Sequence, residues 1–180
     1  MTDFLPDKPL AEQPPVSLLA LTLWGEARGE PVLGKRAVAW VVRNRMSIAE
    51  AWLERKGRQH PLFGDGTVAG VVLRPYQFSC WLKGDPNSIH MHEAIATEAA
   101  NFSPGLWAIL KAVAKGVLAD VPEWADPTYG ATHYCALYKA DGSPLWGEDN
   151  PKAWHGKQEI ESGRTVEKVV INNHVFARVA

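Results

Sequence analysis

Apolar side chains recur with the 3.6-residue period of an amphipathic helix directly after Pro15. This period predicts a first helix over residues 16–27, with a break where Pro31 follows. Proline suits the first position of a helix, so the next helix can begin there. That second helix, expected over about 32–47, is apolar over most of its circumference. We therefore expect it to lie near the centre of the domain.

The same period indicates further helices. A helical stretch over about 48–56 follows the second helix and fades into the turn-rich segment KGRQHPLFGDG. Two more helices are expected over 88–101 and 103–119. A Ser-Pro pair stands at the start of the last one, and apolar residues repeat along one of its faces.

Strand signals are fewer. VAGVVLR, residues 68–74, is a short apolar run stopped by Pro75, and it predicts a short strand. From Asp120 onward the chain is rich in loops, including DPTYGATHYCALY and PLWGEDNPKAW. The closing residues 164–180 predict a β-hairpin or edge strands. The pattern as a whole indicates an α+β fold that is mainly α, with a small β-hairpin or sheet.

The length of the chain, 180 residues, suits one domain. Residues 1–15 carry no helical or strand period and end at a Pro-Pro pair, which predicts a flexible N-terminal arm. Residues 16–180 are then expected to form the single folded domain.

The charge balance narrows the classes of partner. The chain has 19 basic and 20 acidic residues without a basic stripe, so binding to nucleic acid is not expected. No apolar run approaches the roughly 20 residues that span a bilayer, so no stable membrane insertion is expected either. The first residues lack the basic and apolar regions of a secretory signal. A protein that acts outside the cytoplasm would therefore need another exit route.

The cysteine and histidine pattern offers little support for a metal site. Cys80 and Cys135 belong to no C-x-x-C pair, and we expect two free thiols. A metal-dependent hydrolase stays open as an alternative because of a small set of possible ligands. A helix would point His90 and His92 to different faces, however, and no zincin-like motif is present. We therefore expect no metal and no other cofactor. The possible ligands are His90, His92, Glu93, His133 and His155.

Residues 21–31, LTLWGEARGEP, place two glutamates four positions apart at the end of the first helix. Glu26 falls in the last turn, where the negative helix end and apolar neighbours such as Trp24 favour a neutral carboxyl. Glu30 precedes the second helix, whose free amides favour a charged carboxylate. One carboxyl is thus predisposed to donate a proton and the other to stay ionised. The residues alone also allow two solvated glutamates at helix ends.

The wider stretch LTLWGEARGEPVLGKRAVAWVVRNRM resembles the opening motif of the SleB-type cell-wall hydrolases, a family of spore-cortex-lytic enzymes and phage lysins. Its pattern G-E-A-x-G-E, then G-x-x-A-V-A-x-V-x-x-N-R, matches Gly25, Glu26, Ala27, Gly29, Glu30, Gly34, Ala37, Val38, Ala39, Val41, Asn44 and Arg45. Later blocks follow in the family's order: Gln77, Phe78 and Ser79, then His133 and Tyr134. The ending INNHVFARV departs from the pattern at Asn172 and Ala177. The resemblance covers about residues 16–180.

The resemblance implies a monomeric, lysozyme-like domain that binds peptidoglycan glycan strands. It implies cleavage between N-acetylmuramic acid (MurNAc) and N-acetylglucosamine (GlcNAc), often by a lytic transglycosylase reaction that needs no second carboxylate, in contrast to ordinary glycosidases. Glu26 would then be the catalytic acid and base. A non-catalytic peptidoglycan-binding or virion structural module on the same scaffold is the main alternative.

The resemblance also suggests roles for the other matched residues. Gln77, Ser79 and Tyr134 would orient Glu26 and the substrate, and His133 is a further candidate contact. Phe78 would either line a sugar subsite or pack in the core, and the same holds for Trp81. For Glu30 we favour a structural role over assistance to catalysis. Asn44 and Arg45 would tie the end of the second helix to the site.

With no signal segment, we expect a lysin made in the bacterial cytoplasm. It would reach the wall through a holin-type membrane hole or as part of a phage particle.

Overall fold

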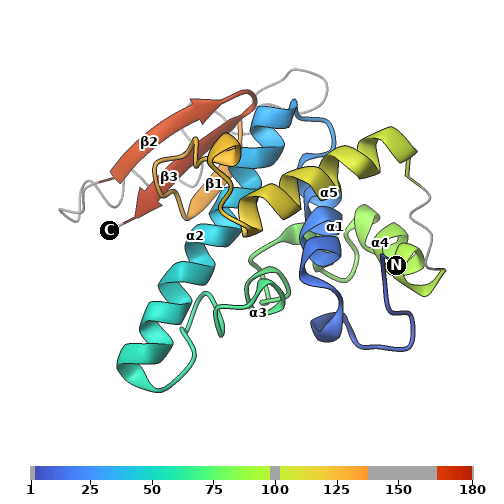
Figure 1. Cartoon of the computed structure of the whole chain (residues 1–180), viewed down its shortest axis with the longest axis horizontal. Coiled ribbons are helices and arrows are strands. Elements are labelled where there is room, and N and C mark those ends of the chain that lie inside the picture. Colours follow the sequence, from blue (N-terminus) through green and yellow to red (C-terminus); the bar gives the residue numbers. More distant parts are fainter. Residues whose placement is uncertain (1–2, 98–101, 138–165, 180) are drawn as a thin grey trace.

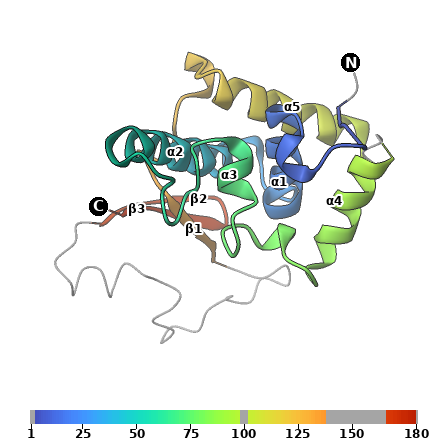
Figure 2. The ribbon, with the colours of Figure 1, turned by 90° about the horizontal axis from the view of Figure 1, so that it is seen from below.

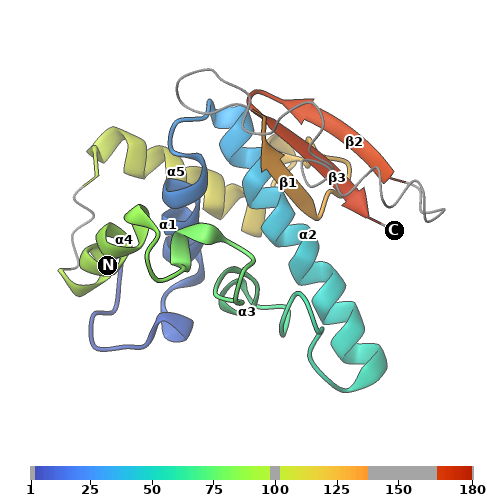
Figure 3. The ribbon, with the colours of Figure 1, turned by 180° about the vertical axis from the view of Figure 1, so that it is seen from behind.

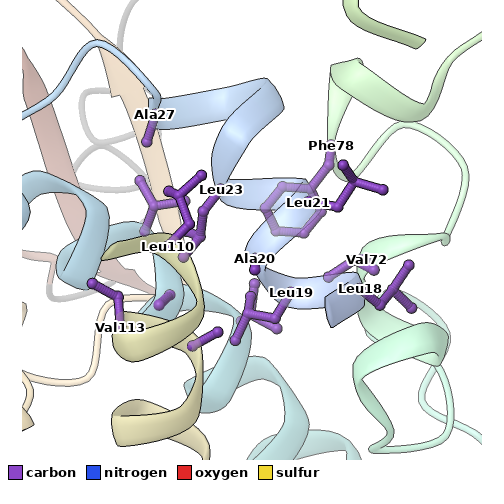
Figure 4. Packing of buried hydrophobic residues seen from close by; sticks show 14 of the residues in the cluster. Leu18, Leu19, Ala20, Leu21, Leu23, Ala27, Val72, Phe78, Leu110 and Val113 are labelled. Atoms are coloured by element: carbon purple, nitrogen blue, oxygen red, sulfur yellow. The ribbon is translucent and has the colours of Figure 1, made fainter. Parts of the chain in front are cut away.

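Helix α1 (Pro15–Ala27) lies in the hydrophobic core of the computed structural model, which describes residues 3–97, 102–137 and 166–179. The sequence predicts an amphipathic helix, yet α1 is buried on nearly every side, because Leu18 and Leu21 are buried as fully as Leu19 and Leu23. It contacts each of the other α-helices in the described ranges and the 3-10 helix η2 (Ser79–Trp81). Figure 4 shows its leucines packed against Val72, Phe78, Leu110 and Val113.

Helix α2 (Val32–Lys56) is continuous where the sequence predicts two helical stretches. No glycine or proline interrupts it near residue 47, so its hydrogen bonds run on to the left-handed C-cap Gly57, whose N–H donates to the Leu53 carbonyl at 2.8 Å. The predicted boundary at 47/48 is therefore wrong. Helix α5 (Pro104–Leu118) agrees with the prediction within one residue at each end. It crosses α1 and α2 on the side of α2 away from the sheet (Figures 1 and 2).

The predicted strand over residues 68–74 is wrong, because this segment forms the short helix α3 (Val68–Val72). Thr67 caps it: its side-chain oxygen accepts a 2.9 Å hydrogen bond from the N–H of Gly70. Val68, Val71 and Val72 are buried, at the spacing of one helical face.

Helix α4 (Pro86–Ala96) begins two residues before the predicted start at 88. The Asp85 carboxylate caps it by accepting a 2.8 Å hydrogen bond from the N–H of Asn87. Thr97 is its C-cap, and the remainder of the predicted helix, residues 98–101, lies outside the described residues.

A three-stranded antiparallel sheet packs beside α2, with the strand order β1-β3-β2 (Figure 3). Strands β2 (Val166–Ile171) and β3 (His174–Val179) form the predicted C-terminal hairpin around Asn172, which has a φ of 53°. Strand β1 (His133–Ala136) falls in a stretch that the sequence predicts as loop. It forms because it pairs with β3, with Tyr134 opposite Phe176. The prediction of a mainly helical fold with a small sheet is confirmed.

Residues 3–13, for which the sequence predicts a flexible arm, lie against the helices. Phe4 is buried against Trp107, and Asp3 forms a 2.9 Å ion pair with Lys111. The buried side chain of Gln13 donates a 2.7 Å hydrogen bond to the Leu5 carbonyl. Mobility of this segment in solution stays a prediction.

Within the described ranges, no helix is both long and apolar enough to cross a bilayer. The stretch PLWGEDNPKAW and His155 lie outside these ranges.

Candidate active site

The carboxyl group of Glu26, in the last turn of α1, lies next to three hydrogen-bond donors. The backbone N–H of Cys80 donates to Oε1 at 3.0 Å, and the hydroxyl of Ser79 lies 3.4 Å from the same oxygen. The hydroxyl of Tyr134, on β1, donates to Oε2 at 2.8 Å. Ser79 is exposed whereas Cys80 is buried, so the carboxyl opens to solvent on the Ser79 side. Segments far apart in the chain therefore orient both oxygens.

Gly25 allows η2 to approach Glu26. A Cβ atom at Gly25 would lie 2.5 Å from the Cβ and 2.9 Å from the Sγ of Cys80, closer than side chains can pack. Because Gly25 has no side chain, Cys80 packs closely against it. The Cys80 N–H then reaches Glu26, the residue next to Gly25. Helix propensity alone disfavours a glycine at this position. The first glycine of the motif thus has a packing role.

Tyr134 is surrounded mainly by rings. Its own ring stacks with that of Phe176 at 5.8 Å and lies 5.5 Å from that of His174 and 6.4 Å from that of Phe78. Burial raises the pKa of the Tyr134 phenol well above its ordinary value, and the charge of Glu26 adds to this effect. The phenol therefore stays protonated and acts as a donor to Glu26 over the whole physiological pH range.

Glu30 makes a largely enclosed contact with His174, whose ring neighbours that of Tyr134. Its Oε1 is 3.5 Å from Nδ1 of His174, and the two side chains are only 13% and 8% exposed. The Nζ of Lys35 donates to the backbone carbonyls of Arg28 and Glu30 and so holds the turn between α1 and α2. Burial lowers the pKa of His174, while the charges of Glu30 and Glu26 act in the opposite direction. This arrangement leaves Glu30 little access to a substrate.

Arg45 and Asn44 connect the middle of α2 to the loop before β1. The Nε of Arg45 donates to the Thr132 carbonyl at 2.7 Å, and Nδ2 of Asn44 donates to the Ala131 carbonyl at 3.0 Å. Arg45 is 5% exposed, and its guanidinium lies 5.1 Å from the centre of the Phe78 ring. Burial lowers its pKa to about 10, against the opposing effects of Tyr134 and Glu26, so it stays cationic at neutral pH. The expected connection between α2 and this loop is present. It starts from the middle of α2 rather than from its end, because α2 continues to Lys56.

The other sequence candidates lie farther from the carboxyl. Phe78 is buried in the core beneath the site, rather than facing a sugar. Among the described residues, no hydrogen bond joins the side chain of Gln77 to Glu26; its backbone N–H donates to the Arg74 carbonyl. His133 lies beside Thr132 and Phe63, and as the neighbour of Tyr134 on a strand it points to the opposite face. The structure thus brings together Glu26, Ser79 and Tyr134.

The surroundings of Glu26 are more polar than the sequence suggests. We expected apolar neighbours to desolvate the carboxyl, and instead it faces three donors and the nearby charge of Arg45. The Cys80 contact was missed because it uses a backbone N–H, which leaves no side-chain signal. His174 was missed as a site residue, although it stands in the INNHVFARV block.

The possible metal ligands that the structure describes do not gather. Within the described part of the chain, no three His, Cys, Asp or Glu side chains form a candidate metal site. Nδ1 of His90 pairs with Glu93 at 3.6 Å on the surface of α4, while His92 lies edge-on to Trp81. Neither Cys80 nor Cys135 forms a disulfide, in agreement with the sequence prediction. Burial raises the pKa of both thiols, which therefore stay neutral.

Comparison with known proteins assigns the chain to a family. Residues 29–177 match the Cell Wall Hydrolase family, a range that begins just after Glu26. The spore cortex-lytic enzyme of Bacillus subtilis is 30% identical over 137 residues, 76% of this chain and 34% of that protein. The spore cortex-lytic enzyme of Halalkalibacterium halodurans is 28% identical over 137 residues, again 76% of this chain and 32% of that protein. The chain spans about a third of the length of these curated relatives.

A solved structure is also similar: the catalytic domain of the germination-specific lytic transglycosylase SleB from Bacillus anthracis. It has a TM-score of 0.48 and 23% identity, covering 97% of this chain and 100% of that chain. The family match extends over most of the chain, from the turn after α1 to β3. The protein belongs to the Cell Wall Hydrolase family.

Proposed function

We propose that this protein cleaves the β-1,4 bond between MurNAc and GlcNAc in peptidoglycan as a lytic transglycosylase, with Glu26 as the general acid and base. One observation carries the proposal: within the described residues, the Glu26 carboxyl accepts hydrogen bonds from the Cys80 N–H and from the Ser79 and Tyr134 hydroxyls, and none joins it to a second carboxyl group. Such a site holds one carboxyl in a fixed orientation, as a reaction with a single acid and base requires. Membership of the Cell Wall Hydrolase family supports peptidoglycan as the substrate.

The reaction needs only one carboxyl group. The proton of Glu26 passes to the glycosidic oxygen while the bond from that oxygen to C1 of MurNAc breaks, which leaves an oxocarbenium-like centre. The Glu26 carboxylate then takes the proton of the 6-hydroxyl of the same MurNAc, and that oxygen bonds to C1. The product is a 1,6-anhydro sugar, and Glu26 is protonated again. Attack by water would instead give a reducing MurNAc.

The neighbours of Glu26 suit both halves of this cycle. Tyr134 and the Cys80 N–H hold the carboxyl in one orientation, as a positioned acid requires. The cationic Arg45 lies close enough to influence Glu26 and stabilises the carboxylate left after the proton is transferred. Ser79, on the exposed side, is placed to contact the bound sugar.

The position of Glu30 argues against the two-carboxylate scheme of ordinary glycosidases. Its carboxylate contacts His174 and its side chain is only 13% exposed, which leaves water and the sugar ring little access to it. We assign Glu30 a structural role in the turn between α1 and α2, in keeping with the Lys35 contacts there.

Mass spectrometry of the muropeptides released from purified sacculi tests the proposal. Anhydro-muropeptides as the main product are the expected result, unchanged in the presence of EDTA. Reducing MurNAc would indicate a hydrolase with the same acid, and free stem peptides would indicate an amidase and overturn the assignment. Binding without any product would support the non-catalytic alternative.

Three finer points stay predictions: the lysozyme-like relationship of the fold, an origin in a phage, and release through a holin-type hole. Co-expression with a holin, compared with expression alone, tests the last point by the rate of host lysis.

A further inference from the structure

Tyr76 occupies a backbone position that favours glycine. The N–H of Gln77 donates to the Arg74 carbonyl at 3.2 Å and closes a turn with Pro75 second and Tyr76 third. Tyr76 has a φ of 65°, in the left-handed region. Proline followed by a left-handed residue is the pattern of a type II turn, whose third position normally holds glycine or asparagine. The local backbone therefore gives no reason for a tyrosine here.

Packing gives no reason for it either. The Tyr76 side chain is 86% exposed, the largest exposure of any large hydrophobic side chain in the described residues. A bulky ring held outward by a strained turn contributes little to the core. Backbone strain of this kind collects at functional sites, where the rest of the fold supports it.

The turn lies on the segment that supplies two of the donors to Glu26. Tyr76 and Ser79 are three positions apart in the chain, so their Cα atoms are at most about 11 Å apart. Pro75 lines a cavity of about 540 Å³ together with Pro15, at the start of α1, whereas Ser79 and Cys80 reach Glu26, at its end. The segment 75–80 thus runs from the start of α1 toward the candidate catalytic carboxyl at its end. Tyr76 lies near the beginning of this segment.

We infer that the ring of Tyr76 is a stacking platform for a sugar of the glycan strand, one or more residues away from the cleaved bond. The face of an aromatic ring packs against the C–H bonds of a sugar, while the phenol and the sugar hydroxyls remain hydrated. A glycan strand extends on both sides of the bond being cut, so a substrate held at Glu26 must pass over neighbouring surface. This inference rests on the proposed function for its occupant, a peptidoglycan glycan strand.

Tyr129 provides a matched control. It also has a left-handed φ, 56°, and is 72% exposed. However, it lies beside Ser47 and Ile48 of α2, on a loop that makes no hydrogen bond to Glu26 within the described residues. Asparagine tolerates the left-handed region, so Tyr76→Asn and Tyr129→Asn each remove a ring while keeping the turn. Tyr76→Phe keeps the ring and removes only the hydroxyl.

The first measurement is the kinetics of cleavage of glycan strands stripped of stem peptides, with melting temperatures as a check on folding. For Tyr76→Asn we expect KM to rise about three- to tenfold with kcat little changed. Tyr76→Phe and Tyr129→Asn should match the wild type, and all variants should melt close to it. An unchanged KM in Tyr76→Asn would overturn the inference. So would an equal rise in Tyr129→Asn or in Tyr76→Phe.

The second measurement separates this inference from the proposed function, because it needs no catalysis. Co-sedimentation with the same glycan strands compares Glu26→Gln with the Glu26→Gln, Tyr76→Asn double variant. Weaker binding of the double variant supports the platform even if the wild type cleaves nothing, in which case only the proposed reaction fails. Equal binding by the two proteins, with wild-type cleavage intact, overturns the platform and leaves the proposed reaction standing.

Discussion

The hydroxyl of Tyr134 donates a 2.8 Å hydrogen bond to Oε2 of Glu26, across 108 residues of sequence. This bond joins the last turn of α1 to β1, the strand that the sequence did not predict. It exists because β3 aligns β1, with Phe176 opposite and stacked on Tyr134. The small sheet therefore has a direct part in the candidate site: it carries one of the groups that orient the acid.

Replacing Tyr134 by phenylalanine should lower kcat on sacculi about 10- to 100-fold, because a hydrogen bond to a charged group contributes about 1.5–3 kcal/mol. The ring stays in place, so the variant should still fold. Steady-state release of muropeptides measures the effect. Tyr129→Phe removes a hydroxyl from an exposed ring and serves as the control. Equal activity of the two variants would show that the Tyr134 bond does not orient Glu26.

Alanine at Gly25 should affect both stability and activity. Its Cβ would lie 2.5 Å from the Cβ of Cys80, so η2 must move away from Glu26. We expect the free energy of unfolding to fall by about 1–3 kcal/mol. Activity should fall about 10- to 100-fold as the donor shifts. Gly29→Ala meets no atom within 4 Å and should change the free energy of unfolding by less than about 0.5 kcal/mol. Urea unfolding and muropeptide release measure the two effects, and a Gly25→Ala variant as active as Gly29→Ala contradicts the packing role.

The buried contact of His174 with Glu30 predicts how stability depends on pH. Burial lowers the pKa of His174 below its ordinary value of 6.5, against the smaller opposing effects of Glu30 and Glu26. Below about pH 6.5 the unfolded chain therefore binds more protons than the folded one, and the free energy of unfolding falls as the pH falls. His60, whose pKa is lowered by burial and by Arg74, acts in the same direction.

In His174→Gln the slope of the free energy of unfolding against pH should decrease by the equivalent of at most about one proton, with the remainder due to His60. Urea unfolding between about pH 5 and 7.5 measures the slope. Gly29→Ala supplies the control, because it removes no titratable group and should keep the wild-type slope. If His174→Gln also keeps it, burial does not disfavour the protonated imidazole.

The Thr67 cap explains why residues 68–72 form the helix α3 and not the predicted strand. Thr67→Ala removes the acceptor of the Gly70 N–H and should lower the free energy of unfolding by about 1 kcal/mol. Ser103→Ala is the matched control, since Ser103 precedes α5 without a side-chain cap hydrogen bond. Equal unfolding midpoints for the two variants would count against the cap.

The long helices could be predicted because each has a persistent apolar period and a proline near its start, as in α1 and α5. The helix formed by VAGVV could not be predicted from its apolar pattern, because five apolar residues fit a strand or a helix equally well. The cap that Thr67 provides decides in favour of the helix. Strand β1 has only four residues, and its partner β3 lies about 40 positions away, so no local pattern reveals it.

The candidate site was predictable where a motif named a side chain. Glu26, Ser79 and Tyr134 belong to three motif blocks and meet in the structure. The Cys80 contact depends on a backbone N–H, and the nearby charge of Arg45 depends on how α2 crosses the site. Such features arise from the packing of elements, and single-residue patterns do not encode them.

The most direct test of the account is the rate of anhydro-muropeptide release by Glu26→Gln, compared with the wild type and with Glu30→Gln. The glutamine has the same shape: its oxygen can accept from the Cys80 N–H and its NH2 group can donate to the Tyr134 hydroxyl. It cannot donate an acidic proton, so the fold should persist and the melting temperature should change little. We predict a loss of about 10²- to 10⁴-fold for Glu26→Gln and a much smaller loss for Glu30→Gln. A folded Glu26→Gln variant that releases anhydro-muropeptides at the wild-type rate, or one less impaired than Glu30→Gln, would contradict the assignment of Glu26 as the acid.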